Sequence, residues 1–512
     1  MDERTFDTII VGAGPAGCVL AARLSEDVDR QVLLIDAGPD YGSDPAGWPP
    51  ELLDPYATEW VSHAWGYTNA AAEDGAIRHG LPRARVFGGC STVNACQWFR
   101  GSRIDYDAWE TAGNTGWGWD DLFPYFLKSE SDDHGDPSVH GDAGPVRISR
   151  EPDERLGLSD RLLAETAAEL GFEWLDDLNG SDRQFPSLGR TPKNIDNGHR
   201  LNGSLTYLKA ARDRANLTLL PDTLIDRVLM EGTRAVGVRA ADGRELRARE
   251  VIVSGGAYAS PAILLRSGIG AAGQLHDLGI PLVRDLSGVG QHLLDHPFIS
   301  PYTSGMTLWP IRPGMETGRR VFVQLMLRAR SSQVNEEIDL HFYPREILDP
   351  RTGGWVFGFG ISLMYARSKG RVRLTSRDPE ATLDIDHRWF SESADLQSLA
   401  DGVEIAARLA TTPPLAGMLD ISAEQHALLR DRDAVKRVLL AEAATTFHPS
   451  STCRMGPSVD PTAVVDATCR VHGVDRLRVV DASIFPWGPR CNLHAPIIAV
   501  AERAADVIRR DT

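Results

Sequence analysis

Two histidines near the C-terminus of this 512-residue chain could carry out proton transfer. His448 lies in the run FHPSSTCRMG, and His494 lies in the run CNLHAP. A neutral imidazole titrates close to physiological pH, so either side chain could remove a proton from a substrate. Because a buried histidine more often only satisfies local hydrogen bonds, the pair gains weight only through the elements that would position it.

The opposite end of the chain has the pattern of a dinucleotide-binding site. An apolar strand, Thr8 to Val11, leads into the run GAGPAG at residues 12–17, and a helix rich in Ala and Leu, Ala16 to Leu24, follows. The glycines permit a tight turn, close approach of a pyrophosphate and close packing of helix on strand. A second strand, Gln31 to Ile35, ends at Asp36, which is placed to accept a hydrogen bond from a ribose 2′-OH. The acid disfavours NADP, but the motif does not separate FAD from NAD.

Composition indicates a soluble globular protein with two domains and excludes several function classes. The chain is 42% hydrophobic and 24% charged, and its length exceeds one ordinary core. A net charge of −17 without a block of Lys and Arg predicts no nucleic-acid partner and no anionic membrane partner. The first strand starts within a few residues of the N-terminus and no apolar run approaches a membrane span, so we expect a cytoplasmic location. The six cysteines show neither a C-x-x-C pair nor a metal-ligand spacing, so we predict no disulfide framework and no metal site.

Residues 224–256 predict a three-stranded antiparallel meander that returns to the nucleotide-binding sheet. Its strands are Leu224 to Met230, Ala235 to Arg239 and Glu250 to Val253, and glycine turns separate them. This insertion is common in FAD-binding versions of the doubly wound fold, so it favours a flavin.

The chain after Pro297 predicts a second domain built on an antiparallel sheet. Its expected strands are Val321 to Ala329, Ile338 to Tyr343, Trp355 to Tyr365 and Gly370 to Thr375, and its expected helix is Ala394 to Ala410. A further strand, Leu477 to Val480, is expected to return to the first domain. A closing helix should run from Pro496 to about Arg509, with the proline at the first helical position. If that helix begins at a flavin, its positive end would stabilise the reduced ring.

Four blocks of sequence resemble signatures of the glucose–methanol–choline (GMC) flavin oxidoreductases. They are residues 83–95 (RARVFGGCSTVNA), 256–270 (GAYASPAILLRSGIG), 288–297 (GVGQHLLDHP) and 373–379 (RLTSRDP). The resemblance extends over nearly the whole chain. It implies an α/β (α+β) fold in which residues 1–155, 205–298 and 440–512 form a Rossmann-like FAD-binding domain. Residues 156–204 and 299–439 would form the antiparallel-sheet, substrate-binding domain.

The resemblance also implies FAD as the cofactor and assigns residues to it. The implied FAD-binding residues are Gly12, Gly14, Pro15, Ala16, Gly17, Asp36, Ala37, Arg85, Val86, Gly89, Asn94, Ala95, Val228, Asp481, Ala482 and Pro496. Some family members carry a histidine in the first signature that bonds covalently to the flavin. Val93 takes that place here, so we expect non-covalent FAD.

His448 and His494 match the catalytic pair of the family, whose second member is Asn or His. Oxidation of an alcohol removes a hydride from carbon, which flavin N5 can accept, and a proton from oxygen. We expect His448 to be the base and His494 to hydrogen-bond the same oxygen. The expected substrate-binding residues are Phe447, Trp355, Phe357, Arg490 and Asn492. Arg490 could recognise a carboxylate or simply pair with a surface acid. The other histidines, His140, His296 and His341 among them, are expected to be structural.

The function implied is oxidation of a small-molecule primary alcohol to the aldehyde, with electrons passing to O2 or a quinone-type acceptor. The stretch from Val321 to Arg330 carries Gln324 and no acid, which disfavours a quaternary ammonium substrate such as choline. It is more similar to relatives that oxidise furanic, aromatic or other uncharged primary alcohols. A choline or polyol dehydrogenase, a hydroxynitrile-lyase-like protein whose FAD stays oxidised, and a nucleotide binder without catalysis are the alternatives. The sequence leaves the electron acceptor and the oligomeric state open.

Overall fold

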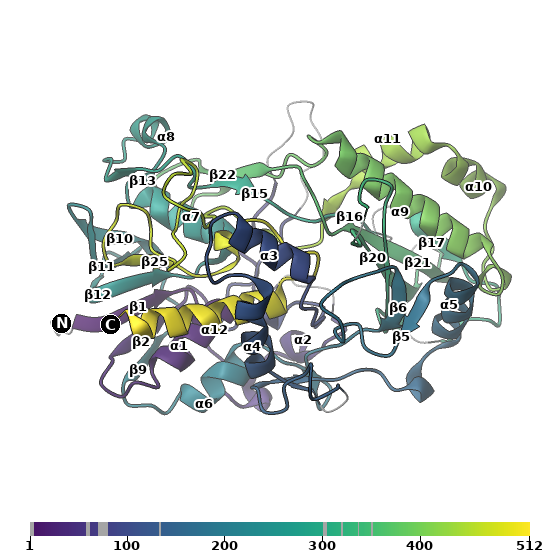
Figure 1. Cartoon of the computed structure of the whole chain (residues 1–512), viewed down its shortest axis with the longest axis horizontal. Coiled ribbons are helices and arrows are strands. Elements are labelled where there is room, and N and C mark those ends of the chain that lie inside the picture. Colours follow the sequence, from purple (N-terminus) through teal and green to yellow (C-terminus); the bar gives the residue numbers. More distant parts are fainter. Residues whose placement is uncertain are drawn as a thin grey trace.

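The structure, a computed structural model, describes residues 5–57, 62–69, 80–132, 135–300, 305–318, 321–335, 337–349 and 352–511. Within these residues a seven-stranded sheet and a nine-stranded sheet dominate, and smaller sheets lie around them. Figure 1 shows the two large sheets toward opposite ends of the long axis of the molecule. None of the described helices combines the length and the hydropathy needed to cross a bilayer.

The first sheet has the parallel core that the N-terminal sequence predicts. Its parallel strands are β1 (Thr5–Val11), β2 (Val32–Ile35), β9 (Leu217–Leu220), β12 (Glu245–Val253) and β25 (Leu477–Val479). All four residues of β2 are buried, as the continuous apolar run requires for a strand covered on both faces. Helix α1 (Pro15–Leu24) follows β1 directly, so the predicted strand, glycine turn and helix are confirmed.

The predicted meander is confirmed as well. β10 (Ile225–Glu231) pairs antiparallel with β11 (Arg234–Ala240), which pairs antiparallel with β12. The last strand is longer than predicted, because its first half completes the meander and its second half lies beside β1.

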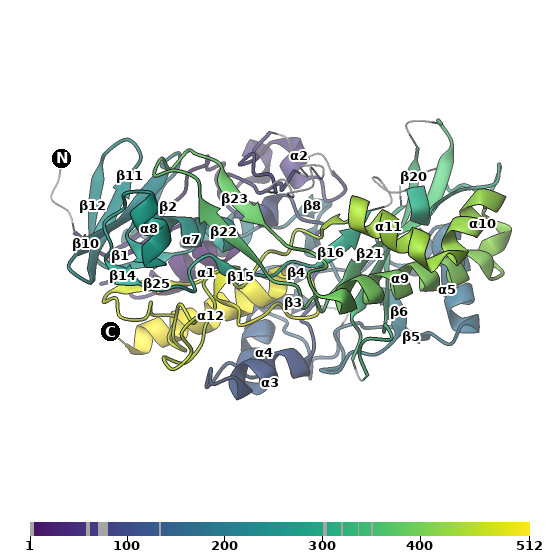
Figure 2. The same cartoon turned by 90° about the horizontal axis from the view of Figure 1, so that it is seen from above.

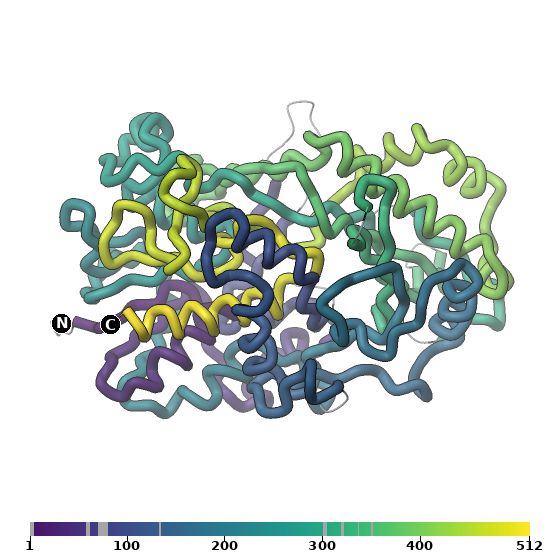
Figure 3. Tube along the Cα trace, viewed as in Figure 1, coloured from purple at the N-terminus to yellow at the C-terminus, as the bar shows by residue number. Residues whose placement is uncertain are grey.

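The closing helix, α12 (His494–Arg510), begins two residues before the predicted start at Pro496. Proline occupies the third helical position instead of the first, which is still tolerated because the first four N–H groups of a helix have no intrahelical partner. The prediction of the start was therefore wrong, and the helix begins at His494 itself. Helix α12 packs against α1, with Arg23 and Glu502 in an ion pair at 2.7 Å. Figure 3 shows this C-terminal segment in yellow beside the purple N-terminal segment.

The second sheet is largely antiparallel, with one face covered by helices. Its main strands, in spatial order, are β24 (Ala444–Thr445), β16 (Pro297–Ile299), β21 (Trp355–Leu363), β20 (Leu340–Leu348), β19 (Leu325–Ala329), β6 (Ser187–Arg190) and β5 (Glu173–Leu175). β17 (Leu308–Pro310) pairs with β21, and β18 (Val321–Phe322) pairs with β20. Its covering helices include α9 (Ser393–Thr411), α5 (Leu158–Glu169), α10 (Ala423–Arg430) and α11 (Arg432–Glu442). The predicted helix and the antiparallel character are confirmed.

Two predicted strands differ from the structure. The segment from Val321 to Ala329 is divided into β18 and β19, because Val323 has a left-handed backbone, with φ at 49°. The segment predicted at 370–375 forms β22 (Gly370–Leu374), but it does not join the second sheet. It pairs with β15 (Gln291–Leu293) and β23 (Leu383–Asp386) and packs on α7 (Gly256–Arg266) of the first domain, as Figure 2 shows.

Short elements connect these layers. They are α2 (Pro50–Leu53), α3 (Arg103–Thr111), α4 (Trp119–Ser129), α6 (Lys209–Ala211), α8 (Ala272–Asp277), β3 (Glu130–Asp132), β4 (Val146–Ile148), β7 (Ile195–Asp196), β8 (His199–Arg200), β13 (Ile269–Gly270) and β14 (Arg284–Asp285).

Candidate active site

His448 faces a second histidine, His296, because two short strands pair. His448 follows β24 and His296 precedes β16, and these strands are antiparallel, with Pro297 opposite Thr445. The Nδ1 atoms of His296 and His448 are 3.0 Å apart, and their rings meet edge to face with centroids 5.1 Å apart. The expectation that His296 is only structural therefore needs correction, since it contacts the candidate base.

A buried carboxylate fixes the backbone of His448. The Asp295 Oδ1 accepts hydrogen bonds from the backbone N–H of His448 at 3.0 Å and of His296 at 2.8 Å. Its Oδ2 accepts from the hydroxyl of Thr445. Burial alone would raise the pKa of Asp295, but hydrogen bonding from His387 and Thr445 lowers it to about 2. Asp295 is thus ionised at neutral pH and anchors both histidines.

The side chain of His448 is arranged as a neutral base. Burial, followed by the neighbouring His296, holds its pKa well below the usual range. The Nδ2 of Asn492 lies 3.3 Å from His448 Nε2. When this amide donates, Nε2 carries the lone pair, and the Nδ1–H of His448 donates to His296, a tautomer assigned from the hydrogen-bond network.

His494 is arranged as a neutral donor. Its Nδ1 lies 3.2 Å from the Nδ2 of Asn94, whose Oδ1 accepts the backbone N–H of Cys96 at 3.0 Å. Asn94 therefore donates to Nδ1, and the ring proton is on Nε2. Burial lowers the pKa of His494 to about 4. Within the described chain, neither His494 Nε2 nor Asn492 Oδ1 has a hydrogen-bond partner, although both are buried. Such atoms cost about 1–3 kcal/mol each, so they fit a site that binds a polar group.

The glycine loop has the shape that a pyrophosphate requires. Gly12 has a left-handed φ of 104°, and a Cβ at Gly17 would overlap the carbonyl oxygen of Gly12. A Cβ at Gly14, by contrast, would meet nothing within 4 Å. Space for a ligand thus lies beside the middle glycine, at the N-terminus of α1, where Pro15, Ala16 and Gly17 begin the helix.

Asp36 and the first signature segment close around this loop. The carboxylate of Asp36 accepts the N–H groups of Ala13 at 2.7 Å and Gly38 at 2.8 Å, and burial raises its pKa to about 6. The guanidinium of Arg85 donates to the carbonyl of Ala37 at 2.9 Å. A Cβ at Gly89 would overlap Gly14, so the two loops touch.

The remaining residues predicted for FAD are spread along the same domain. Val86 is buried beside Val93 in one small apolar cluster, and Ala95 follows Asn94. Asp481 accepts the N–H of Gly256 at 2.8 Å, and the next residue, Ala482, accepts the N–H of Ser451. The N–H of Val228 donates to the hydroxyl of Ser267 at 2.9 Å. Pro496 is buried in the first turn of α12. Their contacts with FAD stay a prediction.

Two predicted substrate residues, Trp355 and Phe357, lie away from the histidines. In β21 the side chains alternate, and Phe357 belongs with Ile361 to the buried face that packs on α9. The strand reaches the histidines near Ser362, whose hydroxyl bonds Thr446. Phe357 is five positions earlier, about 17 Å along the strand. Trp355 is farther still.

The other predicted substrate residues lie closer to the pair. Asn492 contacts His448, and Phe447 precedes it with a left-handed φ of 68°. Arg490 is buried and engaged: its Nη1 is 2.6 Å from Asp105 Oδ1, and its guanidinium lies 4.1 Å from the ring centre of Tyr365. The acid that pairs with Arg490 is therefore buried, not on the surface as one sequence alternative had it.

Sequence reasoning missed an apolar cluster on the other face of the second sheet. The cluster comprises Phe99, Leu178, Phe298, Val323, Met326, Tyr343 and Cys491. His341 occupies the same face, two residues before Tyr343, and contacts the ring of Phe99. Burial, and then the charge of Arg328 on the adjacent strand, hold the pKa of His341 well below its usual range. The period-2 pattern around His341 and Tyr343 was the available signal.

Comparisons with known proteins agree with this architecture. Residues 6–298 and 366–501 match the N-terminal and C-terminal models of GMC oxidoreductase. The chain is 35% identical to mitochondrial choline dehydrogenase of Mus musculus, over 99% of the chain and 90% of that protein. It is 36% identical to the oxygen-dependent choline dehydrogenase of Paraburkholderia xenovorans, over 99% and 95%. Among solved structures, pyridoxine 4-oxidase from Mesorbium loti matches with a TM-score of 0.87 and 30% identity, over 99% of both chains. A formate oxidase variant from Aspergillus oryzae matches with a TM-score of 0.88 and 25% identity, over 100% and 99%.

Proposed function

The chain belongs to the GMC oxidoreductase family, and from that premise we propose that it oxidises a primary alcohol to the aldehyde, with His448 as the base. As a member of this family it binds FAD. The open space beside Gly14, the left-handed turn at Gly12 and the buried Asp36 fit that cofactor, and these residues would hold it. When bound, FAD supplies a hydride acceptor at N5 and a chromophore that reports the reaction.

The observation that carries the proposal is that the two neutral imidazoles have opposite hydrogen-bonding roles: Nε2 of His448 is an acceptor, and Nε2 of His494 is a donor. Asn492 and His296 fix the tautomer in which His448 Nε2 carries the lone pair, and this lone pair can accept the alcohol proton when the alcohol O–H replaces the Asn492 amide as its donor. His494 Nε2–H can donate to the same oxygen, because Asn94 occupies its other nitrogen. One ring then removes the proton while the other stabilises the negative charge that develops on the oxygen.

We infer that the preferred substrate is an uncharged alcohol with an apolar or aromatic body. The apolar cluster that includes Phe298 and Tyr343 supports this class. A guanidinium, Arg328, shares this sheet face, and the Asp295 carboxylate is already engaged by two backbone N–H groups, the Thr445 hydroxyl and the His387 ring. A quaternary ammonium would gain little attraction from such a setting.

Choline is the second candidate, because the chain is 35% identical to a choline dehydrogenase over almost its full length. Anaerobic mixing of the holoenzyme with choline, polyols, benzylic alcohols and hydroxymethyl heteroarenes would separate the candidates. Bleaching of the flavin by an uncharged aromatic alcohol at a higher rate than by choline supports our inference, and the reverse order overturns it. Repetition with O2 and with an artificial dye identifies the acceptor. Consumption of substrate while the flavin stays oxidised would identify a lyase instead.

Two variants test the roles of the histidines. His448→Ala should retain FAD, seen in its absorbance spectrum, but slow flavin reduction about 10²- to 10⁴-fold, as expected for loss of a general base. His494→Asn should have a milder effect, because an amide can still donate to the alcohol oxygen. Reduction at the wild-type rate in both variants would remove the pair from the mechanism.

A further inference from the structure

Trp98 contacts His494 from a buried position just after the first signature segment. The two rings meet at 84° with centroids 5.3 Å apart, and Trp98 has no exposed surface. The same segment supplies Asn94, which binds His494 Nδ1. Asn94 determines which nitrogen carries the proton, and the indole restricts rotation of the imidazole about its side-chain bonds.

The indole is held in turn by a buried carboxylate. Trp98 Nε1 donates to Glu130 Oε2 at 2.8 Å, and the carbonyl of Trp98 accepts from Asn179 Nδ2 at 2.8 Å. Glu130 lies where α4 ends and β3 begins, and it is fully buried. His494 is thus connected to Glu130 through a single side chain.

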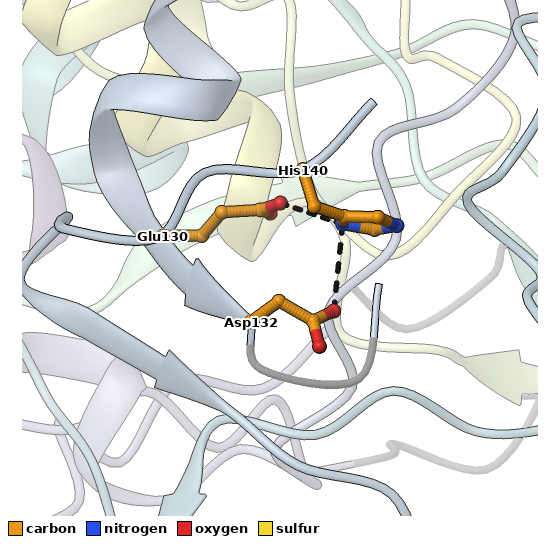
Figure 4. A group of neighbouring side chains, drawn as sticks. All are labelled: Glu130, Asp132 and His140. Carbon is orange, nitrogen blue, oxygen red and sulfur yellow. Dashed lines mark hydrogen bonds and ion pairs between the residues drawn. The ribbon is translucent and has the colours of Figure 1, made fainter. Parts of the chain in front are cut away.

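Glu130 belongs to a cluster of charged side chains in which His140 is central. Figure 4 shows the His140 ring facing the carboxylates of both Glu130 and Asp132, and Nδ1 lies 2.8 Å and 3.4 Å from their oxygens. His140 Nε2 lies 2.6 Å from Asp177. Arg100 pairs with Glu130, and Arg150 pairs with Asp132 and Asp177, which completes the cluster.

This cluster forms an ion-pair network. Each nitrogen of His140 faces a carboxylate oxygen, which can only accept, so a protonated ring that donates from both nitrogens satisfies these contacts. Arg100 Nη2 lies 3.0 Å from His140 Nδ1, and both approach the same oxygen, Oε1 of Glu130. Although burial opposes it, hydrogen bonding to Asp177 and Glu130 raises the pKa of His140 to about 9. The carboxylates of Glu130, Asp132 and Asp177 are then balanced by Arg100, Arg150 and protonated His140. The network is neutral as a whole and rigid, so it suits a mechanical support.

We propose that Trp98 is a positioning residue for His494, and that Glu130 acts on the reaction through Trp98 by holding its indole. This role rests on the proposed function of His494 as the donor to the alcohol oxygen. Displacement of such a donor by about 1 Å costs on the order of 100-fold in rate, which gives the scale of the expected effects.

The first test compares two tryptophans. Trp98→Phe keeps an aromatic ring but loses the hydrogen bond to Glu130, and it should slow flavin reduction about 10- to 100-fold. The control is Trp117→Phe, because Trp117 is also fully buried and donates to a carbonyl, that of Ala467, at 2.9 Å. The control should lose stability but keep the wild-type rate. In a His494→Ala background, Trp98→Phe should have no further effect.

A readout that does not depend on turnover comes from ¹⁵N NMR of the imidazoles, with His494 assigned by its absence in His494→Ala. In the wild type His494 should be a single Nε2–H tautomer, and in Trp98→Phe its signals should shift or show a second tautomer. Unchanged signals of His494 in Trp98→Phe would overturn the positioning role. A wild-type rate in His494→Ala would instead overturn the proposed function, and the two failures are thus distinguishable.

The second test separates the charge of Glu130 from its hydrogen bond. Glu130→Gln and Glu130→Ala remove the same charge, but only Gln keeps an oxygen that can accept from the indole. The rate of flavin reduction in Glu130→Gln should lie within about twofold of the wild-type rate. The rate in Glu130→Ala should fall to that of Trp98→Phe. Equal rates in the two variants would show that Glu130 does not act through Trp98. If Glu130→Ala does not fold, the NMR signals of His494 in Trp98→Phe and Glu130→Gln decide.

Discussion

Replacement of His140 by Gln should remove a pH-dependent part of the stability of this protein. The pKa of His140 is about 9 in the folded chain and 6.5 in its ordinary state. Each unit of difference corresponds to about 1.4 kcal/mol, so protonated His140 contributes about 3 kcal/mol to the free energy of unfolding. Because the folded pKa is the higher one, this contribution is complete below pH 6.5. It declines as the pH rises and is lost above about pH 9.

The window from pH 6.5 to 8.5 isolates this residue well. Burial lowers the pKa values of His292 and His296 to about 4, so their effect on stability changes below pH 6.5, where the unfolded chain takes up protons. Burial raises the pKa of Asp36 to about 6, so its effect is also complete near the start of the window. Contributions of the buried thiols are common to all variants and cancel in the comparison.

The assay is urea unfolding of the holoenzyme at pH 6.5, 7.5 and 8.5, with FAD in fixed excess and far-UV circular dichroism as the signal. The wild type should lose about 2 to 3 kcal/mol across the window, and His140→Gln should lose much less. His472→Gln is the matched control, since His472 Nε2 contacts a carbonyl, that of Gly456, at 2.9 Å. An equal decline in the wild type and His140→Gln would refute the charge balance assigned to the Glu130 cluster.

Further predictions concern the base, the cofactor and the core. Because the pKa of His448 is held well below 6.5, the rate of flavin reduction should be flat from about pH 6.5 upward and fall only in acid, which stopped-flow absorbance would measure. Gly14→Ala should fold but bind FAD more weakly, because its Cβ would meet only the ligand. Gly17→Ala should lose both stability and FAD binding, because its Cβ would overlap the carbonyl oxygen of Gly12. Thermal melting with and without FAD separates the two effects. Acid precipitation should release the flavin into the supernatant, because Val93 offers no covalent attachment. Phe357→Ala should cost about 3–5 kcal/mol of stability, with little change in the rate of flavin reduction in the folded fraction.

The first domain was predictable because its signals are local. The apolar strand, the glycine turn and the helix that ends at Leu24 are adjacent in sequence. Apolar residues indicate the buried strand, glycines indicate the turn, and Ala and Leu indicate the helix. The meander was predictable for the same reason. The start of α12 was not, because Pro496 is compatible with several positions in a first turn.

The contacts between distant segments were not predictable from the sequence. His296 meets His448 through the pairing of β16 with β24, strands of three and two residues with no periodicity to detect. Alternation in β21 places Phe357 and Ile361 on one face, but it cannot say which face turns toward the histidines. The sequence therefore identified the catalytic candidates, while the contact of His448 with His296 depends on long-range strand pairing.

The last strand, β25, lies beside β12 in the same sheet as β1, the first strand of the chain. During synthesis β1 leaves the ribosome more than four hundred residues before β25. At about 5–20 residues per second, β25 and α12, which covers α1, are synthesised on the order of 25 to 90 s after β1. Apolar surface stays uncovered throughout that interval. Productive expression should therefore respond to chaperone supply, and chains truncated before residue 477 should aggregate on the ribosome or soon after release.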